Sequence, residues 1–256
     1  YSRYNETKPG QSLEEANYYN KLYYHRLGTT QAEDVLVYER PDQKEWSFGG
    51  EVTEDGRYLV ITVSKGTDPK YLVFFKDLTG GDGPIAPLVD TWEAEYTFLG
   101  NDGPVFWFQT NLDAPRRRVI AIDTRTPDRQ SWKELVPQAA ETLNSVSVVG
   151  ERFLASYLVD AHAEVRVFRL DGQLERKIAL PGMGTVGGFG GKRKDAETFY
   201  SFTDFTAPTT IYRYDMATGQ STLFRQPKVD IDPATYETRQ IFYSSKDGTR
   251  VPMFVS

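Results

Sequence analysis

Short segments of alternating or continuously apolar residues, each bounded by turn residues, recur along the whole chain. Alternation with a period of two indicates half-buried β-strands, whereas an amphipathic helix needs apolar positions three and four residues apart. No long stretch has the helical spacing, and the two short helix candidates, 12–16 and 137–142, are better explained as loop turns. The pattern therefore predicts an all-β protein.

The turns between these segments repeat with a regular period. Steps of 47, 47 and 45 residues separate successive turns of one series, which lie at Asp55-Gly56, Asp102-Gly103, Val149-Gly150 and Lys194-Asp195. A second series, offset from the first, keeps a similar spacing from Asp77 to Asp215. This spacing is typical of a β-propeller, in which each blade has four antiparallel strands and is buried against its neighbours. A β-sandwich with coincidental spacing is the alternative, and agreement between the two series favours the propeller.

Between these turns the expected strands fall into sets of four. The four complete sets are 45–51, 58–63, 71–77 and 85–89; 94–99, 105–110, 119–123 and 132–136; 143–149, 153–159, 164–169 and 174–179; and 185–189, 198–205, 209–214 and 221–225. Three further strands, 1–4, 22–27 and 35–38, precede them as a partial blade. Downstream, a strand at 236–243 is followed by an Asp247-Gly248 hairpin turn and an apolar strand at 251–255. We therefore expect an incomplete propeller of about four full blades plus a partial one.

Composition excludes several classes of function. The chain has no cysteine, which removes disulfides, thiol nucleophiles and thiolate metal sites. Its net charge of -6 is spread along the chain without a basic stripe, so we expect no nucleic-acid partner. No apolar run approaches the roughly 20 residues of a membrane span, so we expect no membrane partner. The absence of cysteine fits the cytoplasm, with the periplasm as the alternative.

Residues for catalysis or for binding a cofactor are scarce in this sequence. The two histidines are expected to be structural or at the surface, His25 within a strand and His162 in a turn, and no Gly-x-Ser-x-Gly motif accompanies them. The glycine-rich run 182–191 lacks the Gly-Lys-Ser/Thr ending of a phosphate-binding loop. Small residues that let neighbouring strands approach closely explain it better. The residues alone predict no catalytic group, no metal site and no cofactor.

Several segments resemble the prolyl oligopeptidase family of serine peptidases, in an order and spacing that span nearly the whole chain. They are Lys21-Leu-Tyr-Tyr-His-Arg-Leu-Gly-Thr29, Asp55-Gly-Arg-Tyr58, Glu93-Ala-Glu-Tyr96, Trp132-Lys-Glu-Leu-Val-Pro137, Phe199-Tyr-Ser-Phe202 and Tyr243-Ser-Ser-Lys-Asp-Gly-Thr-Arg-Val-Pro-Met-Phe254. The resemblance implies a seven-bladed propeller that caps an α/β-hydrolase domain. Residues 1–235 would then be a partial propeller, and residues 236–256 the exit strand and first hairpin leading into a hydrolase domain that this sequence lacks.

The resemblance also implies an activity for the parent protein. It would be a prolyl-specific serine endopeptidase that cleaves short proline-containing peptides, and the propeller would sieve substrates by excluding folded proteins. The family's catalytic serine, aspartate and histidine would lie beyond residue 256, so no residue here matches them. Two alternatives remain open: a propeller scaffold for protein–protein binding, and the propeller of a related acylaminoacyl peptidase.

Five residues match family positions that reach the pocket upstream of the substrate proline. The family's strand residue just after the tryptophan at position 46 corresponds here to Ser47 or Phe48, and Ser64, Lys65 and Thr67 lie before and inside the Gly66-Thr-Asp-Pro69 turn. The sequence departs from the mammalian-type pattern, which carries an arginine where Ser64 stands. Lys65 is adjacent, but a strand would direct its side chain to the opposite face. The alternative is that these residues only form a blade turn.

Overall fold

A computed structural model describes residues 1–5, 17–81, 83–229 and 235–256 of the chain. Within these ranges the secondary structure consists of β-strands and two short 3-10 helices, η1 (Gln31–Glu33) and η2 (Arg129–Ser131). The all-β prediction is therefore confirmed. The stretch 137–142 is irregular up to the first residue of a strand, as expected, and the helix candidate at 12–16 lies outside the described residues. No helix in the described ranges is long and apolar enough to cross a membrane.

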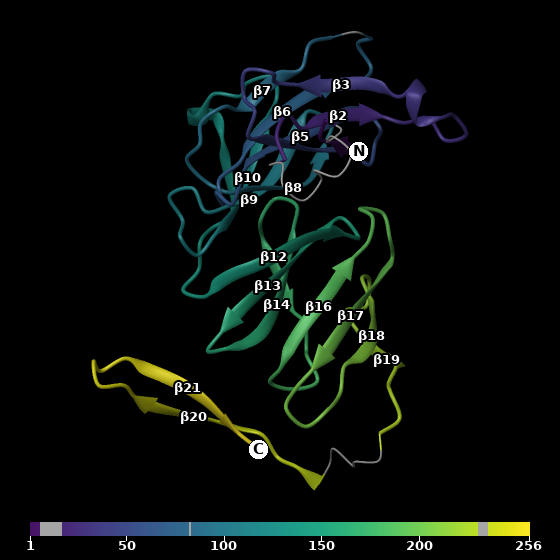
Figure 1. Cartoon of the computed structure of the whole chain (residues 1–256). Coiled ribbons are helices and arrows are strands. Elements are labelled where there is room, and N and C mark those ends of the chain that lie inside the picture. The colour runs from purple at the N-terminus through teal and green to yellow at the C-terminus, as the bar shows by residue number, and fades with distance from the viewer. Residues whose placement is uncertain (6–16, 82, 230–234) are drawn as a thin grey trace, which may run out of the picture. The chain divides into compact units, whose positions relative to one another are not determined.

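Strands that follow one another in sequence are neighbours in each sheet (Figure 1). A three-stranded sheet contains β1 (Ser2–Arg3), β2 (Lys21–Tyr24) and β3 (Val35–Glu39), and a four-stranded sheet contains β4 (Trp46–Val52), β5 (Tyr58–Lys65), β6 (Leu72–Asp77) and β7 (Ala86–Val89). The next four-stranded sheet contains β8 (Tyr96–Asp102), β9 (Val105–Thr110), β10 (Arg118–Asp123) and β11 (Lys133–Val136).

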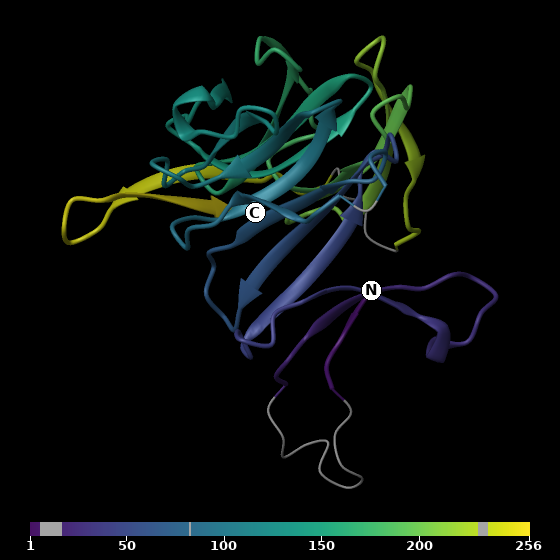
Figure 2. The same cartoon turned by 90° about the horizontal axis from the view of Figure 1, so that it is seen from above.

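Two more four-stranded sheets and a hairpin complete the described strands. One sheet contains β12 (Thr142–Val149), β13 (Arg152–Val159), β14 (His162–Arg169) and β15 (Leu174–Lys177), and the other contains β16 (Thr185–Gly190), β17 (Glu197–Thr203), β18 (Thr210–Asp215) and β19 (Ser221–Arg225). Strands β20 (Arg239–Ser244) and β21 (Arg250–Val255) form a two-stranded antiparallel ribbon, seen in both views (Figure 1 and Figure 2). The sheets match the predicted sets of four strands and the partial first set.

The chain divides into two compact units, which we describe separately. Unit 1 comprises Tyr1–Asp113 and Ala121–Trp132, and unit 2 comprises Ala114–Ile120 and Lys133–Ser256. In unit 1, Leu22 of the first sheet packs against the apolar face of β4, β5 and β6, a cluster that includes Trp46, Phe48 and Ile61. Burying each such side chain contributes roughly 1.5–3 kcal/mol, so neighbouring sheets hold each other in place.

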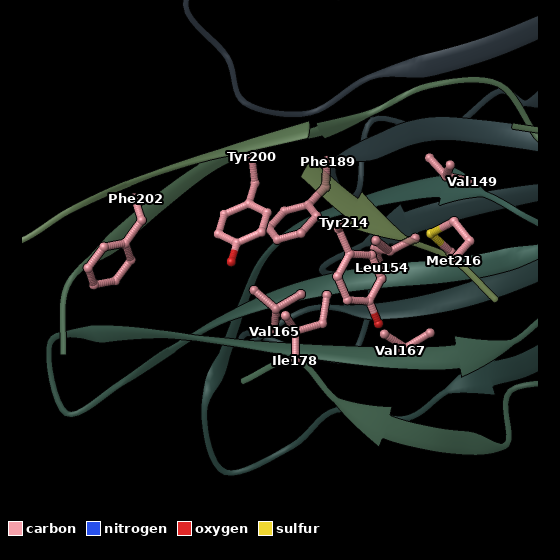
Figure 3. Close-up of a cluster of buried hydrophobic side chains, with 10 residues drawn as sticks. All are labelled: Val149, Leu154, Val165, Val167, Ile178, Phe189, Tyr200, Phe202, Tyr214 and Met216. Atoms are coloured by element: carbon pink, nitrogen blue, oxygen red, sulfur yellow. The ribbon is translucent and has the colours of Figure 1, made fainter. Parts of the chain in front are cut away.

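The core of unit 2 lies between its two four-stranded sheets (Figure 3). The first sheet supplies aliphatic side chains, and the second supplies mainly the aromatic side chains of Phe189, Tyr200, Phe202 and Tyr214. Tyr214 also accepts a 2.9 Å hydrogen bond at its hydroxyl from Nε of Arg176, which reaches across from β15. The same guanidinium donates to the carbonyl oxygen of Met216 at 2.7 Å. Each sheet therefore completes its neighbour's core and satisfies its neighbour's polar groups, as expected for stacked repeats.

Two-residue turns connect several strand pairs. Gly150 and Glu151 have φ values of 59° and 58°, and Asp160 and Ala161 have φ values of 44° and 66°. Positive φ at both central residues defines the type I′ turn, whose twist matches that of the flanking strands. Val159 pairs directly with His162, so His162 begins β14 and does not lie in the turn where the sequence had suggested it.

Candidate functional site

Cross-strand register places the five predicted site residues at one end of the β4–β5 pair. Ser47 is paired with Ser64, whereas Phe48 is paired with Val63. Lys65 is paired with Trp46. Directly opposed residues point to the same face of a sheet, and successive residues point to opposite faces. Ser47 and Ser64 therefore share one face, and Phe48 and Lys65 share the other.

Phe48 lies in the core of unit 1. Its side chain is 3% exposed and belongs to the buried cluster that joins the first two sheets. Its ring meets that of Tyr38 edge-on, with centroids 5.1 Å apart. Its backbone N–H donates to Oδ1 of Asn20 at 2.9 Å. Because the ring is enclosed between two sheets, these contacts give Phe48 a packing role. The sequence had predicted a contact with substrate instead.

The two serines form a polar, uncharged surface on the opposite face. Both are half-buried, and the hydroxyls of Tyr4 and Ser47 are 3.0 Å apart, within hydrogen-bond distance. Serine and tyrosine hydroxyls can donate and accept hydrogen bonds without carrying charge at neutral pH. This face is therefore suited to peptide groups or neutral polar side chains. Tyr4 was not anticipated from the sequence, because its contact with Ser47 spans 43 residues.

Lys65 is the last residue of β5, and Thr67 lies in the turn that follows; both are exposed. The N–H of Asp68 donates to the carbonyl oxygen of Lys65 at 3.0 Å, and Gly66 has a φ of 52° that favours glycine. The Nζ atom of Lys65 is 3.6 Å from Oε2 of Glu45, and both side chains are about half exposed. This solvent-screened pair contributes little to stability. Lys65 is the member of the five predicted site residues that carries a charge, and the register places its side chain on the face opposite that of Ser64.

Among the described residues, neither histidine forms a nucleophile–base arrangement with a serine. Nδ1 of His25 is 2.6 Å from Oδ1 of Asp34, whose other oxygen accepts a hydrogen bond from the hydroxyl of Tyr1. The hydrogen bond from Tyr1, with that of His25 adding to it, lowers the pKa of Asp34 despite partial desolvation. The hydroxyl in this cluster is a phenol hydrogen-bonded to a carboxylate, not an activated serine. Nδ1 of His162 is buried without a hydrogen-bond partner among the described residues.

The glycine-rich run is explained by close packing of β16. A Cβ atom on Gly184 would lie 2.2 Å from the carbonyl oxygen of Thr203, and one on Gly188 would lie 2.8 Å from that of Phe199. Gly188 also has a φ of 100° at a β-bulge. Glycines are therefore required where β16 meets β17, as the sequence indicated. Across the described ranges, no group of three or more histidine or acidic residues could hold a metal ion.

The C-terminal hairpin contacts two blade turns within unit 2. Nε2 of Gln240 donates to the carbonyl oxygen of Asp160 at 2.6 Å, and the rings of Phe254 and Phe205 are 5.2 Å apart. Asp160 lies in the turn between the second and third strands of its sheet, and Phe205 lies in the equivalent turn of the next sheet. In the sheet of β4–β7, the turn that contains Gly66 likewise joins the second strand, β5, to the third, β6. The turn that carries Lys65 and Thr67 is thus equivalent to those that contact the hairpin.

Comparison with known proteins assigns the fold. A family model described as the prolyl oligopeptidase N-terminal β-propeller domain matches residues 1–227. A prolyl endopeptidase of Elizabethkingia miricola is 34% identical over the whole chain, and prolyl oligopeptidase A of Amanita bisporigera is 30% identical over 91% of it.

The structural comparison agrees with the family match. The apo structure of prolyl oligopeptidase B from Galerina marginata superposes with a TM-score of 0.88 at 30% identity, covering 99% of this chain and 36% of that protein. The chain likewise spans 36% of the Elizabethkingia protein and 32% of the Amanita protein, about a third of each. The resemblance inferred from the sequence is confirmed: the chain belongs to the family of prolyl oligopeptidase N-terminal β-propeller domains.

Proposed function

We propose that this chain is the substrate-gating propeller portion of a serine peptidase that cleaves short peptides after proline. The observation that carries the proposal is the family match over residues 1–227, together with relatives named prolyl endopeptidases and prolyl oligopeptidases. In this proposal residues 1–235 belong to a seven-bladed propeller. Residues 236–256 lead into an α/β-hydrolase domain, which supplies the serine, histidine and aspartate for peptide hydrolysis.

The substrate-facing surface in this proposal is the end of each blade where its second and third strands are connected. Two such turns in unit 2 contact the β20–β21 hairpin, the segment proposed to enter the hydrolase domain. The equivalent turn after β5 carries Lys65 and Thr67, and the hydroxyls of Ser47 and Ser64 lie next to it on the β4–β5 pair. Ser47, Ser64 and Thr67 would contact the peptide upstream of its proline, while Phe48 supports them from the packed face, the face to which Lys65 also points.

The absence of an arginine at position 64 has a consequence for specificity. A guanidinium forms charge-assisted, often bidentate hydrogen bonds with carboxylates, whereas a serine hydroxyl forms a single neutral one. Lys65 does not replace the guanidinium, because it points to the other face and lies 3.6 Å from Glu45. The proposed enzyme would therefore show little preference for acidic side chains upstream of proline.

Cleavage assays on the full-length protein test the proposal. We expect hydrolysis of a glycyl-prolyl reporter and loss of that activity with a serine-directed phosphonate. The same proline-containing sequence should be cleaved as a free short peptide and resist cleavage inside a folded protein. The 256-residue chain alone should be inactive, because neither histidine is arranged with a serine nucleophile in the part of the chain that the structure describes. Absence of cleavage by the full-length protein would favour a binding scaffold, and equal cleavage of folded protein would refute the sieving role.

A further inference from the structure

A cavity of about 170 Å³ lies in unit 2, where the β13–β14 turn, the segment leading into β16, the β17–β18 turn and the β20–β21 hairpin meet. The residues that line it include His162, Met183, Asp204, Phe205 and Phe254. The two sheets beside it, β12–β15 and β16–β19, each have all four strands. An apolar cavity of about 150 Å³ holds a benzene molecule, so this cavity is large enough for a group of that size.

Asp204 contributes a half-buried carboxylate whose two oxygens differ in their contacts. Its Oδ1 atom accepts three hydrogen bonds, from the N–H and hydroxyl of Thr206 at 2.8 and 3.0 Å and from the N–H of Ala207 at 2.7 Å. Its Oδ2 atom accepts none from the described residues. Apart from His162, no other ionisable residue is found among the described residues that line the cavity. The carboxylate therefore favours a cationic group.

His162 contributes a second polar atom without a partner. Its Nδ1 atom is buried and makes no hydrogen bond to any described residue. Buried polar atoms in native proteins are almost always hydrogen-bonded, so an orphaned one next to a cavity indicates a bound group. A ring nitrogen of neutral histidine can accept a hydrogen bond from an N–H donor. Two acceptors from the turns of two different sheets are thus carried by residues that line the same cavity.

The apolar side chains and the saturated Oδ1 atom decide which cation fits. The rings of Phe205 and Phe254 have centroids 5.2 Å apart, and aromatic faces attract cations and the methylene groups next to them. A guanidinium pairs best with both oxygens of a carboxylate, whereas an ammonium is a point charge with three rotatable donors. Because Oδ1 of Asp204 is already occupied, a single carboxylate oxygen remains, which suits an ammonium better than a guanidinium.

We infer that this cavity binds a primary alkylammonium group. Two of its N–H donors bond Oδ2 of Asp204 and Nδ1 of His162, the third is left to water, and the alkyl stem lies against Phe205 and Phe254. Two sources share this chemistry: a free aliphatic amine and the lysine side chain of a peptide. The cavity lies at the end of the blades where second and third strands connect, which is the substrate-facing end in the proposed function. Binding of an amine there does not depend on peptidase activity.

Ligand-observed NMR titration of the full-length protein at neutral pH with three matched probes tests this site. We expect butylamine to bind, 1-butanol to bind about tenfold more weakly because it lacks the charge, and butyrate not to bind. Asp204→Asn keeps Oδ1 as an acceptor but replaces Oδ2 with an amide NH₂, so it should lower the affinity for butylamine to that for butanol. His162→Phe keeps a ring but removes Nδ1, and should lower the butylamine affinity about threefold or more.

Asp215→Asn is the matched control for Asp204→Asn. Oδ1 of Asp215 accepts the same set of three hydrogen bonds, from the N–H of Ala217 and from the N–H and hydroxyl of Thr218, but Asp215 does not line the cavity. Its replacement should leave the butylamine affinity unchanged. Circular dichroism would verify the folding of each variant, and His162→Phe tests the site independently if Asp204→Asn does not fold.

The lysine source is tested with acetyl-Gly-Lys-Gly amide, the same peptide acetylated at the lysine Nζ, and acetyl-Gly-Arg-Gly amide. Binding of the lysine peptide but not of its acetylated form supports a side chain as the ligand, and binding of butylamine alone supports a free amine. Equal affinity for butylamine, butanol and butyrate, or an unchanged butylamine affinity in both Asp204→Asn and His162→Phe, would overturn the inference. So would equal affinity for the arginine and lysine peptides, or failure of both butylamine and the lysine peptide to bind. None of these outcomes depends on cleavage after proline.

Discussion

Replacement of Phe48 by alanine is the sharpest test of how the predicted site is built. The ring is 3% exposed, packs in the cluster between two sheets and meets Tyr38 edge-on at 5.1 Å. Removing a buried phenylalanine ring costs about 3–5 kcal/mol, since the lost apolar transfer energy is added to the cost of a cavity. For a domain of this size, each kcal/mol shifts the melting temperature by about 2–4 °C. We therefore expect a decrease of roughly 6–20 °C.

Scanning calorimetry on the full-length protein, with two control variants, would measure this effect. Phe48→Leu leaves a smaller cavity than Phe48→Ala and should therefore cost less than Phe48→Ala. Phe199→Ala removes a ring that is 37% exposed, so it should cost clearly less than Phe48→Ala. A melting temperature for Phe48→Ala within 2 °C of the parent would refute the packing argument.

The same variant separates packing from substrate contact. Below its melting temperature, Phe48→Ala should change the specificity constants for a dipeptide-sized and a longer proline substrate by the same factor, because the ring does not reach the surface. A selective loss with the longer substrate, about tenfold or more, would show that the ring contacts the peptide upstream of proline. That result would restore the role predicted from the sequence.

Three further predictions concern stability. Gly188→Ala should lower the free energy of unfolding measured in urea, because φ at this position is 100° and the new Cβ would lie 2.8 Å from a backbone oxygen. Gly190→Ala is the control and should be nearly neutral, because a Cβ there would have no atom within 4 Å; equal losses of stability in the two variants would contradict the argument. Arg176→Met should lower the free energy of unfolding by about 1–3 kcal/mol in the same assay, because the buried hydroxyl of Tyr214 loses its hydrogen-bond donor. An unchanged free energy of unfolding would show that this hydrogen bond between the two sheets does not stabilise the protein. The N–H and hydroxyl of Thr218 lower the pKa of Asp215, so its contribution is present at pH 7 and is lost as the pH falls below about 4. The melting temperature of Asp215→Asn should therefore approach that of the parent in acid, and a constant difference would refute the linkage.

The sequence alone determined where most strands lie, because strand signals are local. Alternation and flanking turn residues predicted 105–110 and 221–225, which are the bounds of β9 and β19. The period of the turns also predicted four sets of four strands, because each blade repeats the same local pattern. The longer predicted strand at 22–27 was less accurate, since β2 ends at Tyr24, before a turn that forms its own hydrogen bonds.

Only the tertiary structure decided which side chains are available for contact. The sequence placed Phe48 and Ser47 together as neighbours, but register and packing against Leu22 bury Phe48 and leave Ser47 beside Tyr4. Local patterns specify strands and turns because these need only nearby residues. Contacts such as that of Gln240 with Asp160, 80 residues apart, exist only once the sheets are stacked.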